Sequence, residues 1–247
     1  MSVSSSFYSG SHNTTSDTVL RSSDGVLFYL TFKVVLSFCK NTFEEFLGAA
    51  ISEKKFRYTI IDIPETSPVL DIIVHLIYQI SVVKQSPSFD DLETAVNRMP
   101  AYGLLPKDYI TPSTPLYGLL LSYAPLHPIR VYSLAGHSNM EELAVRASSY
   151  LVSYDLFELS DDMAVSMGAV YLHRLMCLHY NLKESLKATL LQPPRLHPPI
   201  GACDAIEQNR LSRAWALTAS YVAWSSKTGE CIFVRQFFNK DIFLKQT

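Results

Sequence analysis

The first quarter of the chain alternates short apolar runs with turn signals, in the pattern of β-strands. Two apolar runs, residues 17–21 and 25–30, lie on either side of the pair Asp24-Gly25. An Asp-Gly pair between apolar runs predicts a β-hairpin, because glycine tolerates the positive φ of a tight turn. Residues 58–63 form a third run of this kind. The sequence therefore predicts a small sheet of about three strands.

Helical periodicity begins after the third run. Ser67 followed by Pro68 marks a helix start, because a proline at the first helical position loses nothing by lacking an amide hydrogen. From there the apolar residues recur on one helical face. These residues are Val69, Ile72, Ile73, Leu76, Ile77 and Ile80. We expect this helix to lie against a core.

Beyond Pro128 the strand signals end and helical patterns dominate. The expected helices cover residues 129–135, 140–154, 161–180, 182–191 and 205–226. Two of them carry apolar stripes that we expect to face a core. One stripe comprises Met163, Met167, Val170, Tyr171, Leu175 and Leu178, and the other comprises Leu211, Ala214, Trp215, Thr218, Tyr221 and Val222.

Prolines divide the chain into parts. Between Gln85 and Pro128 there are seven of them, so no long helix fits there, and we expect a domain junction. The predicted organisation is a disordered N-terminal arm over 1–16, an α+β domain with its proline-rich junction over 17–125, an all-α region over 126–226 and an atypical tail over 227–247. The arm is rich in Ser and Thr, and it lacks the basic start and apolar core of a secretory signal.

Composition narrows the class of protein. A hydrophobic content of 48% over 247 residues is enough for a folded core. A net charge of −2 attracts neither nucleic acid nor an anionic membrane, and no apolar run approaches the ~20 residues that span a bilayer. Four cysteines without paired spacing favour free thiols in a reducing compartment. We expect a soluble intracellular protein, cytoplasmic or nuclear.

The sequence can be compared with the residue patterns of two kinds of chemistry, metal binding and catalysis. A zinc site could draw on His173, Cys177, His179, His197 and Cys203, of which His173 and Cys177 share a helical face. The chain contains no Cys-x-x-Cys pair, and ordinary helical residues are the simpler interpretation. Catalytic signatures such as the nucleophile elbow, the phosphate-binding loop and the dinucleotide fingerprint are also missing from the sequence. The sequence thus predicts no enzyme, no cofactor and no bound metal.

Several short motifs together resemble one family. Residues 17–28 follow the order Asp-x-Val-Leu-x-Ser-x-Asp-Gly-x-x-Phe, and residues 171–179 read Tyr-Leu-x-Arg-Leu-x-x-Leu-His. Residues 203–217 read Cys-Asp-x-x-x-Gln-x-x-Leu-x-Arg-Ala-Trp-Ala-Leu. With the predicted order of strands and helices, these motifs resemble the divergent BTB/POZ proteins of mushroom-forming fungi (basidiomycetes). The resemblance implies a BTB/POZ-like α+β domain followed by helices, and a protein–protein interaction function through homodimer formation or partner docking.

The resemblance also suggests more specific roles. One is a substrate adaptor for a cullin ubiquitin ligase, with residues 42–46 as the docking helix and Phe43, Glu44 and Phe46 as its contacts. A second is a transcription-related scaffold that acts through a DNA-binding partner, because the chain has neither zinc-finger spacing nor a basic helix of its own. A third, from the Cys and His residues, is a zinc-stabilised structural domain.

Overall fold

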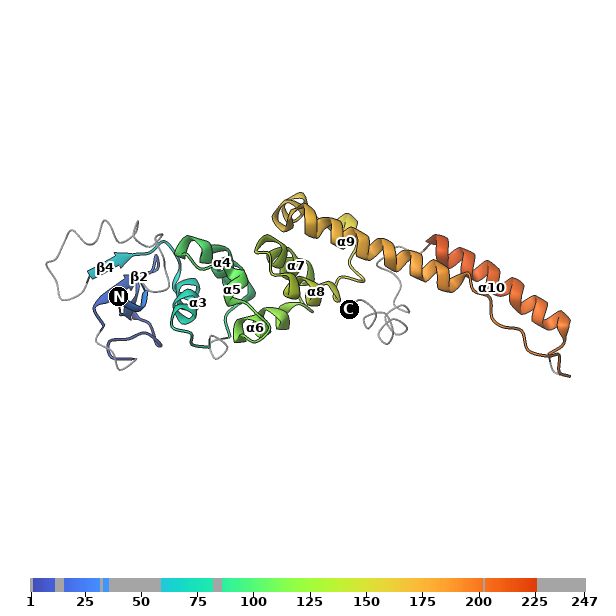
Figure 1. The fold of residues 1–247 in the computed structure, drawn as a ribbon, viewed down its shortest axis with the longest axis horizontal. Coiled ribbons are helices and arrows are strands. Elements are labelled where there is room, and N and C mark those ends of the chain that lie inside the picture. The colour runs from blue at the N-terminus through green and yellow to red at the C-terminus, as the bar shows by residue number, and fades with distance from the viewer. Residues whose placement is uncertain are drawn as a thin grey trace. The chain divides into compact units, whose positions relative to one another are not determined.

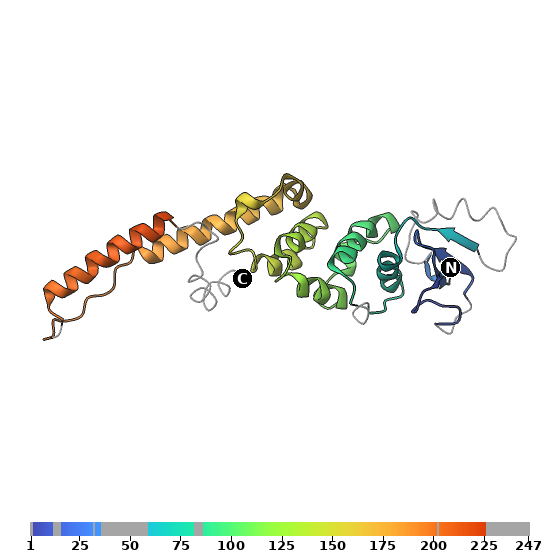
Figure 2. The same ribbon diagram turned by 180° about the vertical axis from the view of Figure 1, so that it is seen from behind.

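The structure is a computed structural model that describes residues 2–11, 16–31, 33–35, 59–81, 86–201 and 203–225. The chain divides into two compact units, Met1–Ala147 (unit 1) and Ser148–Thr247 (unit 2). Unit 1 combines a small sheet with helices, and the described part of unit 2 is helical (Figures 1 and 2). The α+β class expected from the sequence is therefore confirmed, with helix as the dominant element.

Four strands form the sheet of unit 1. They are β1 (Ser2–Val3), β2 (Thr18–Arg21), β3 (Val26–Leu30) and β4 (Thr59–Asp62), in the order β1-β3-β2-β4. Strands β2 and β3 form the expected antiparallel hairpin, and β4 runs parallel to β2. At one end of the β2/β4 pair, the Arg21 side chain forms an ion pair with Asp62, which lies directly opposite it.

Residues 2–11 differ from the sequence-based expectation of a disordered arm over residues 1–16. Ser2–Val3 is a strand that pairs parallel to β3, and the Phe7 ring is completely buried. Phe7 packs edge-on against His75 and lies close to Tyr78 and Phe28. The Ser4 hydroxyl accepts a hydrogen bond from the Phe7 amide. One buried aromatic ring therefore anchors a segment whose composition predicts disorder.

The hairpin turn also positions the first described long helix, α3 (Ser67–Ile77). Gly25 has φ of 81°, as the turn requires. The carboxylate of Asp24 accepts hydrogen bonds from the Ser67 amide at 3.0 Å and the Ser67 hydroxyl at 2.6 Å. These bonds satisfy a donor in the first turn of the helix. The apolar face expected for this helix is buried, apart from its edges at Leu76 and Ile80.

Five further helices lie in the described part of unit 1. They are α4 (Phe89–Arg98), α5 (Pro106–Tyr109), α6 (Pro115–Tyr123), α7 (Pro128–His137) and α8 (Glu141–Ser148), with a 3-10 helix η2 (Met99–Tyr102) after α4. Helix α4 contacts both α3 and α6, and α6 contacts α7. Fully buried side chains such as Ile73, Leu92 and Leu120 form the core between them.

The prolines explain why the expected boundary at residues 125/126 differs from the division at 147/148. Pro100, Pro106, Pro115 and Pro128 each occupy the first or second position of a helix. At these positions proline is favoured, because it has no amide hydrogen to leave unsatisfied. The proline-rich stretch therefore consists of short helices packed within unit 1, and it is not a junction between domains.

Unit 2 contains a 3-10 helix η3 (Leu156–Glu158) and two long helices, α9 (Asp161–Leu190) and α10 (Ala205–Ser225). The sequence predicts a break near residue 181, whereas the structure is helical there and interrupted at Gly168, which has φ 77° and ψ 159°. The helices contact each other and run in opposite directions (Figures 1 and 2). The predicted tail over 227–247 lies outside the described residues.

Candidate protein-binding surface

The docking residues suggested by the sequence, Phe43, Glu44 and Phe46, lie outside the described residues. Their role in docking therefore stays a prediction.

The zinc hypothesis gains one contact from the structure. On α9, the Nε2 atom of His173 lies 3.5 Å from the Sγ atom of Cys177, as their spacing predicts. His179 is buried, whereas His173 is exposed and Cys177 is half-buried, and Nδ1 of His197 lies 2.7 Å from the Pro198 carbonyl oxygen. Within the described ranges, no three His, Cys, Asp or Glu side chains come together as a metal site would require. The zinc-stabilised alternative therefore has two adjacent candidate ligands and no described third.

His179 is unusual for another reason. Its side chain is 3% exposed, and neither ring nitrogen has a hydrogen-bond partner among the described residues. Burial lowers the pKa of His179, and the nearby Leu151 backbone and Asp155 carboxylate oppose this shift only in part. The lowered pKa keeps this buried ring neutral near pH 7.

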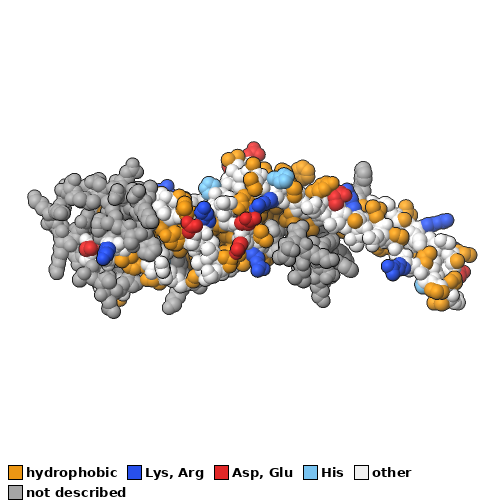
Figure 3. Space-filling view, viewed as in Figure 1, with side chains coloured by type: hydrophobic (Ala, Val, Ile, Leu, Met, Phe, Trp, Pro, Cys, Tyr) orange, Lys and Arg blue, Asp and Glu red, His pale blue; other side chains and the backbone are white. Residues whose placement is uncertain are grey.

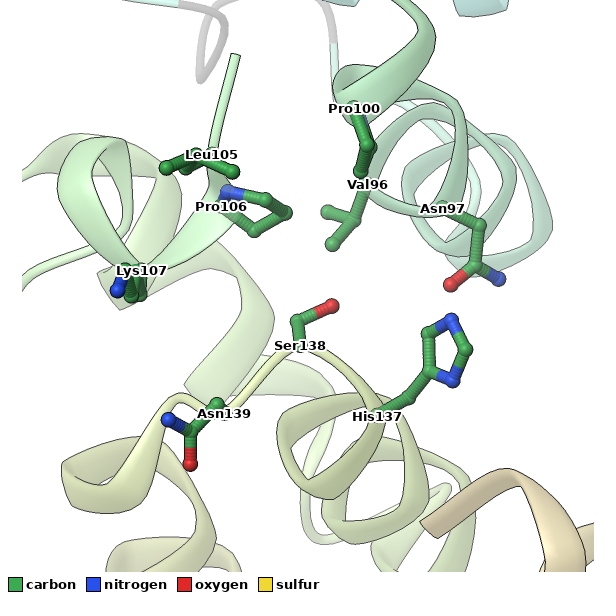
Figure 4. Close-up of a pocket in the computed structure, with 9 residues that line it drawn as sticks. All are labelled: Val96, Asn97, Pro100, Leu105, Pro106, Lys107, His137, Ser138 and Asn139. Carbon is green, nitrogen blue, oxygen red and sulfur yellow. The ribbon is translucent and has the colours of Figure 1, made fainter. Parts of the chain in front are cut away.

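Two open hollows of unit 1 are lined by described residues. The first, of about 270 Å³, is lined by Val96, Asn97, Pro100, Leu105, Pro106, Lys107, His137, Ser138 and Asn139 (Figure 4). Figure 4 shows the side chains of Val96, Asn97, His137 and Ser138 grouped around this hollow. The volume lies below the ~300 Å³ at which small-molecule sites usually begin.

The second hollow, of about 460 Å³, lies between α6 and α8. It is lined by Pro112, Tyr117, Leu121, Glu141, Glu142, Val145 and Arg146. Burial raises the pKa of Tyr117, and the charge of Arg146 lowers it in part. A tyrosine with a raised pKa stays protonated near pH 7 and is no activated nucleophile.

The most distinctive surface of the described residues lies on α10. Among its described side chains Gln208 and Ala219 are buried, while Ile206, Leu211, Leu217 and Tyr221 are 63–74% exposed. The only charged residues of the helix are Glu207, Arg210 and Arg213. On α9, the side chains of Met176 and Tyr180 are also more than half exposed. Figure 3 shows hydrophobic side chains along these helices, with few charges among them.

The structure corrects the expectation that the apolar stripe predicted over residues 211–222 faces a core. The first five stripe positions, Leu211, Ala214, Trp215, Thr218 and Tyr221, are all exposed, and Val222 is half-buried. The α9 stripe agrees better with its expected role, since Met167, Tyr171 and Leu175 are buried and Val170 is exposed. We call the five exposed α10 positions the α10 stripe.

A sequence signal for this surface does exist. Apolar residues of α10 occur outside the stripe as well, at Ile206 and Leu217, so the helix is apolar on more than one side. A helix of this kind needs more than one neighbour to cover it. Periodicity alone does not show how much of this apolar surface the described chain covers.

Comparison with known proteins adds no further constraint: no family model, no curated protein and no solved structure matches this chain. The surface must therefore be interpreted from its own chemistry.

Proposed function

We propose that this chain is a non-enzymatic protein-binding module whose binding surface includes the α10 stripe. The observation that carries the proposal is the exposure of large apolar side chains on a helix with three charged residues among twenty-one. Contiguous apolar patches on a protein surface commonly mark interaction sites. Burying one exposed leucine or tyrosine side chain completely would contribute about 1.5–3 kcal/mol.

The composition of the stripe fits a protein partner. Trp215 is 37% exposed and Tyr221 is 73% exposed, and these two residue types are enriched among the side chains that dominate binding energy at protein interfaces. A nucleic acid would require cations along the stripe, which has none. Among the described residues no helix is long and apolar enough to cross a membrane.

A BTB/POZ-like identity for unit 1 is the second part of the proposal. The supporting feature is topology, namely a hairpin of β2 and β3, β4 parallel to β2, and α3 directly after β4. This is the order of elements on which the resemblance of the sequence rests. Such an identity implies that both units bind protein partners, in the cytoplasm or the nucleus.

Capture of partners by stripe variants tests the function. Leu211→Glu with Tyr221→Glu places two charges on the stripe at exposed positions, where the fold should tolerate them. A matched control, Asn209→Glu with Ser220→Glu, adds the same charge at exposed positions on the opposite side of the helix. Proteins captured by the tagged wild type and the control, and lost by the stripe variant, would support the proposal. Equal capture by all three proteins would refute it.

The cullin-adaptor version requires a separate experiment. Phe43→Ala with Phe46→Ala, in a protein that keeps its helical content, should abolish capture of a cullin. Unchanged capture would remove this version and leave the α10 surface unaffected.

A further inference from the structure

We propose that the α10 stripe binds the same stripe of a second copy of this chain, with the two helices antiparallel. This inference rests on the proposed function, since it names the partner of that surface. Its core is the set Leu211, Ala214, Thr218 and Tyr221, which we call the seam.

The seam has the spacing of a helix–helix contact. Its residues are separated by three, four and three positions, which is the repeat that keeps side chains on one line between two helices. All four are exposed, and none is charged. Trp215 lies beside this line and is partly exposed. The four side chains therefore form one exposed, uncharged line along α10.

The order of side chains along the seam is symmetric, which points to a second copy in particular. Leu211 and Tyr221 each lie five residues from Ala216, and Ala214 and Thr218 each lie two residues from it. An antiparallel pair related by a two-fold axis at Ala216 places Leu211 opposite Tyr221 and Ala214 opposite Thr218. Two-fold contacts require such self-complementarity. The 3-4-3 spacing is symmetric for any helix partner, so the feature that matches a second copy is the order of side-chain sizes, large at both ends and small at the two central positions.

Side-chain size agrees with this pairing. The small residues Ala214 and Thr218 meet at the centre, where the two helix backbones come closest. The large residues Leu211 and Tyr221 meet at the ends, where each can pack across the seam. Trp215 can then cover the flank of the contact.

Charge favours the antiparallel arrangement over the parallel one. In a parallel pair at equal register, Arg210 would lie level with Arg210 of the second copy, and the same holds for Arg213. In the antiparallel pair, Arg210 lies level with Val222 and Arg213 with Ala219. The two Arg213 residues are then offset by about 9 Å along the axis, at 1.5 Å per residue, which is close to the screening length in physiological salt.

The size of the contact sets the expected affinity. The seam from Leu211 to Tyr221 extends about 15 Å along the helix, at 1.5 Å per residue. A stable interface usually buries about 800 Å² on each partner, and one helix line of this length buries less. We therefore expect a reversible dimer with a dissociation constant in the micromolar range, on the order of 1–100 μM.

Sedimentation of the full chain over this concentration range tests the inference. The wild type should shift from the mass of one chain to that of two. Leu211→Glu with Tyr221→Glu should stay monomeric with unchanged helical content, because burying its charges raises the dissociation constant at least about tenfold. Asn209→Glu with Ser220→Glu should dimerise like the wild type. A monomeric wild type, or a stripe variant that still dimerises, would overturn the inference.

A mixing experiment tests the orientation without depending on loss of function. Leu211→Glu alone and Tyr221→Lys alone should each dimerise poorly, and their equimolar mixture should regain dimers. In the antiparallel seam, the new carboxylate at one end faces the new ammonium group of the other copy, while the opposite end keeps the Leu–Tyr contact. No gain on mixing would overturn the antiparallel pairing. If the wild type is monomeric but still captures other proteins through the stripe, the second-copy inference fails and the proposed function stands.

Discussion

At the scale of single residues, the fold depends on a few buried polar groups that have specific partners. Glu65 is 7% exposed, and its carboxylate accepts hydrogen bonds from Nε of Arg98 at 2.8 Å and from the Tyr102 hydroxyl at 3.0 Å. Arg130 similarly bridges Asp90 and Glu93 and lies over the Phe89 ring. A buried carboxylate is stable only while its donors remain, because an unsatisfied charge is costly away from water.

Removing one donor from Glu65 tests this dependence. We expect Tyr102→Phe to lower the free energy of unfolding of unit 1 by about 1–3 kcal/mol, since the phenyl ring keeps the packing and loses the hydrogen bond. The control Tyr8→Phe, at a half-exposed ring, should change it by less than about 0.5 kcal/mol. Urea unfolding followed by hydrogen exchange in α4 measures both. Equal effects of the two changes would contradict the assigned role of the Tyr102 hydroxyl.

At the scale of elements, turns and helix starts could be predicted from the sequence because they depend on neighbouring residues. The parts of the chain that pack around each element could not be predicted. The hairpin at Asp24-Gly25 and the helix starting at Ser67-Pro68 each depend on residues next to one another in the chain. The cap at Ser88, whose hydroxyl accepts from the Asp91 amide at 3.2 Å, is equally local.

The expectations that are wrong concern which parts of the chain an element or side chain packs against. Proline marks both the end of one helix and the start of another, so Pro106 and Pro115 predict a junction as readily as two short helices. Phe7 is one apolar residue in a polar segment, and only the tertiary structure shows the His75 and Tyr78 rings around it. The periodicity that identifies the α10 stripe contains no information on what covers it. The predicted docking residues Phe43, Glu44 and Phe46 lie beyond the described ranges.

The interruption of α9 provides a test at this scale. Gly168 has φ of 77°, a conformation that costs an L-residue about 1 kcal/mol or more, and an added Cβ would meet nothing within 4 Å. We expect Gly168→Ala to destabilise unit 2 by about 1–2 kcal/mol through backbone strain alone. Gly118→Ala is the matched control, because it also has open space but lies within α6 without a positive φ.

The Gly118 change should stabilise unit 1 by about 0.5–1 kcal/mol, since alanine is the better helix former. Thermal unfolding of both variants measures the two effects. Stabilisation by both substitutions would show that residue 168 is helical in solution.

At the scale of the whole molecule, the two units carry buried histidines that respond to pH in opposite directions. Burial lowers the pKa of His75, but the hydrogen bonds and charge of Asp71 outweigh this, so its pKa is raised overall. Its stabilisation of unit 1 is complete below about pH 6.5 and is lost as the pH rises through the raised value. The lowered pKa of His179 has the opposite effect, because below about pH 6.5 the unfolded chain binds a proton that folded unit 2 does not.

His75 should therefore stabilise unit 1 as the pH falls through its raised pKa, and His179 should destabilise unit 2 as the pH falls below about 6.5. We expect His179→Leu to remove the loss of unit 2 stability between about pH 6.5 and the lowered pKa. At pH values above this window, the variant should be at least as stable as the wild type, because it removes a buried polar ring without partners among the described residues. Hydrogen exchange in α9 against pH measures the effect. The exposed His197→Leu is the control, and a pH dependence shared by wild type, variant and control would contradict the assignment.

The short outer strands of the sheet determine which kinds of assembly the described part of the chain can form. Strand β1 has two residues and β4 has four, and these two lie at the edges of the sheet. Long, open strand edges allow copies to add one after another into fibres, whereas short edges give an incoming strand few groups to pair with. A two-fold contact on α10, in contrast, is used up once two copies have met. Together, the short described edges and the proposed two-fold contact on α10 predict an assembly that closes at two copies and does not grow without limit.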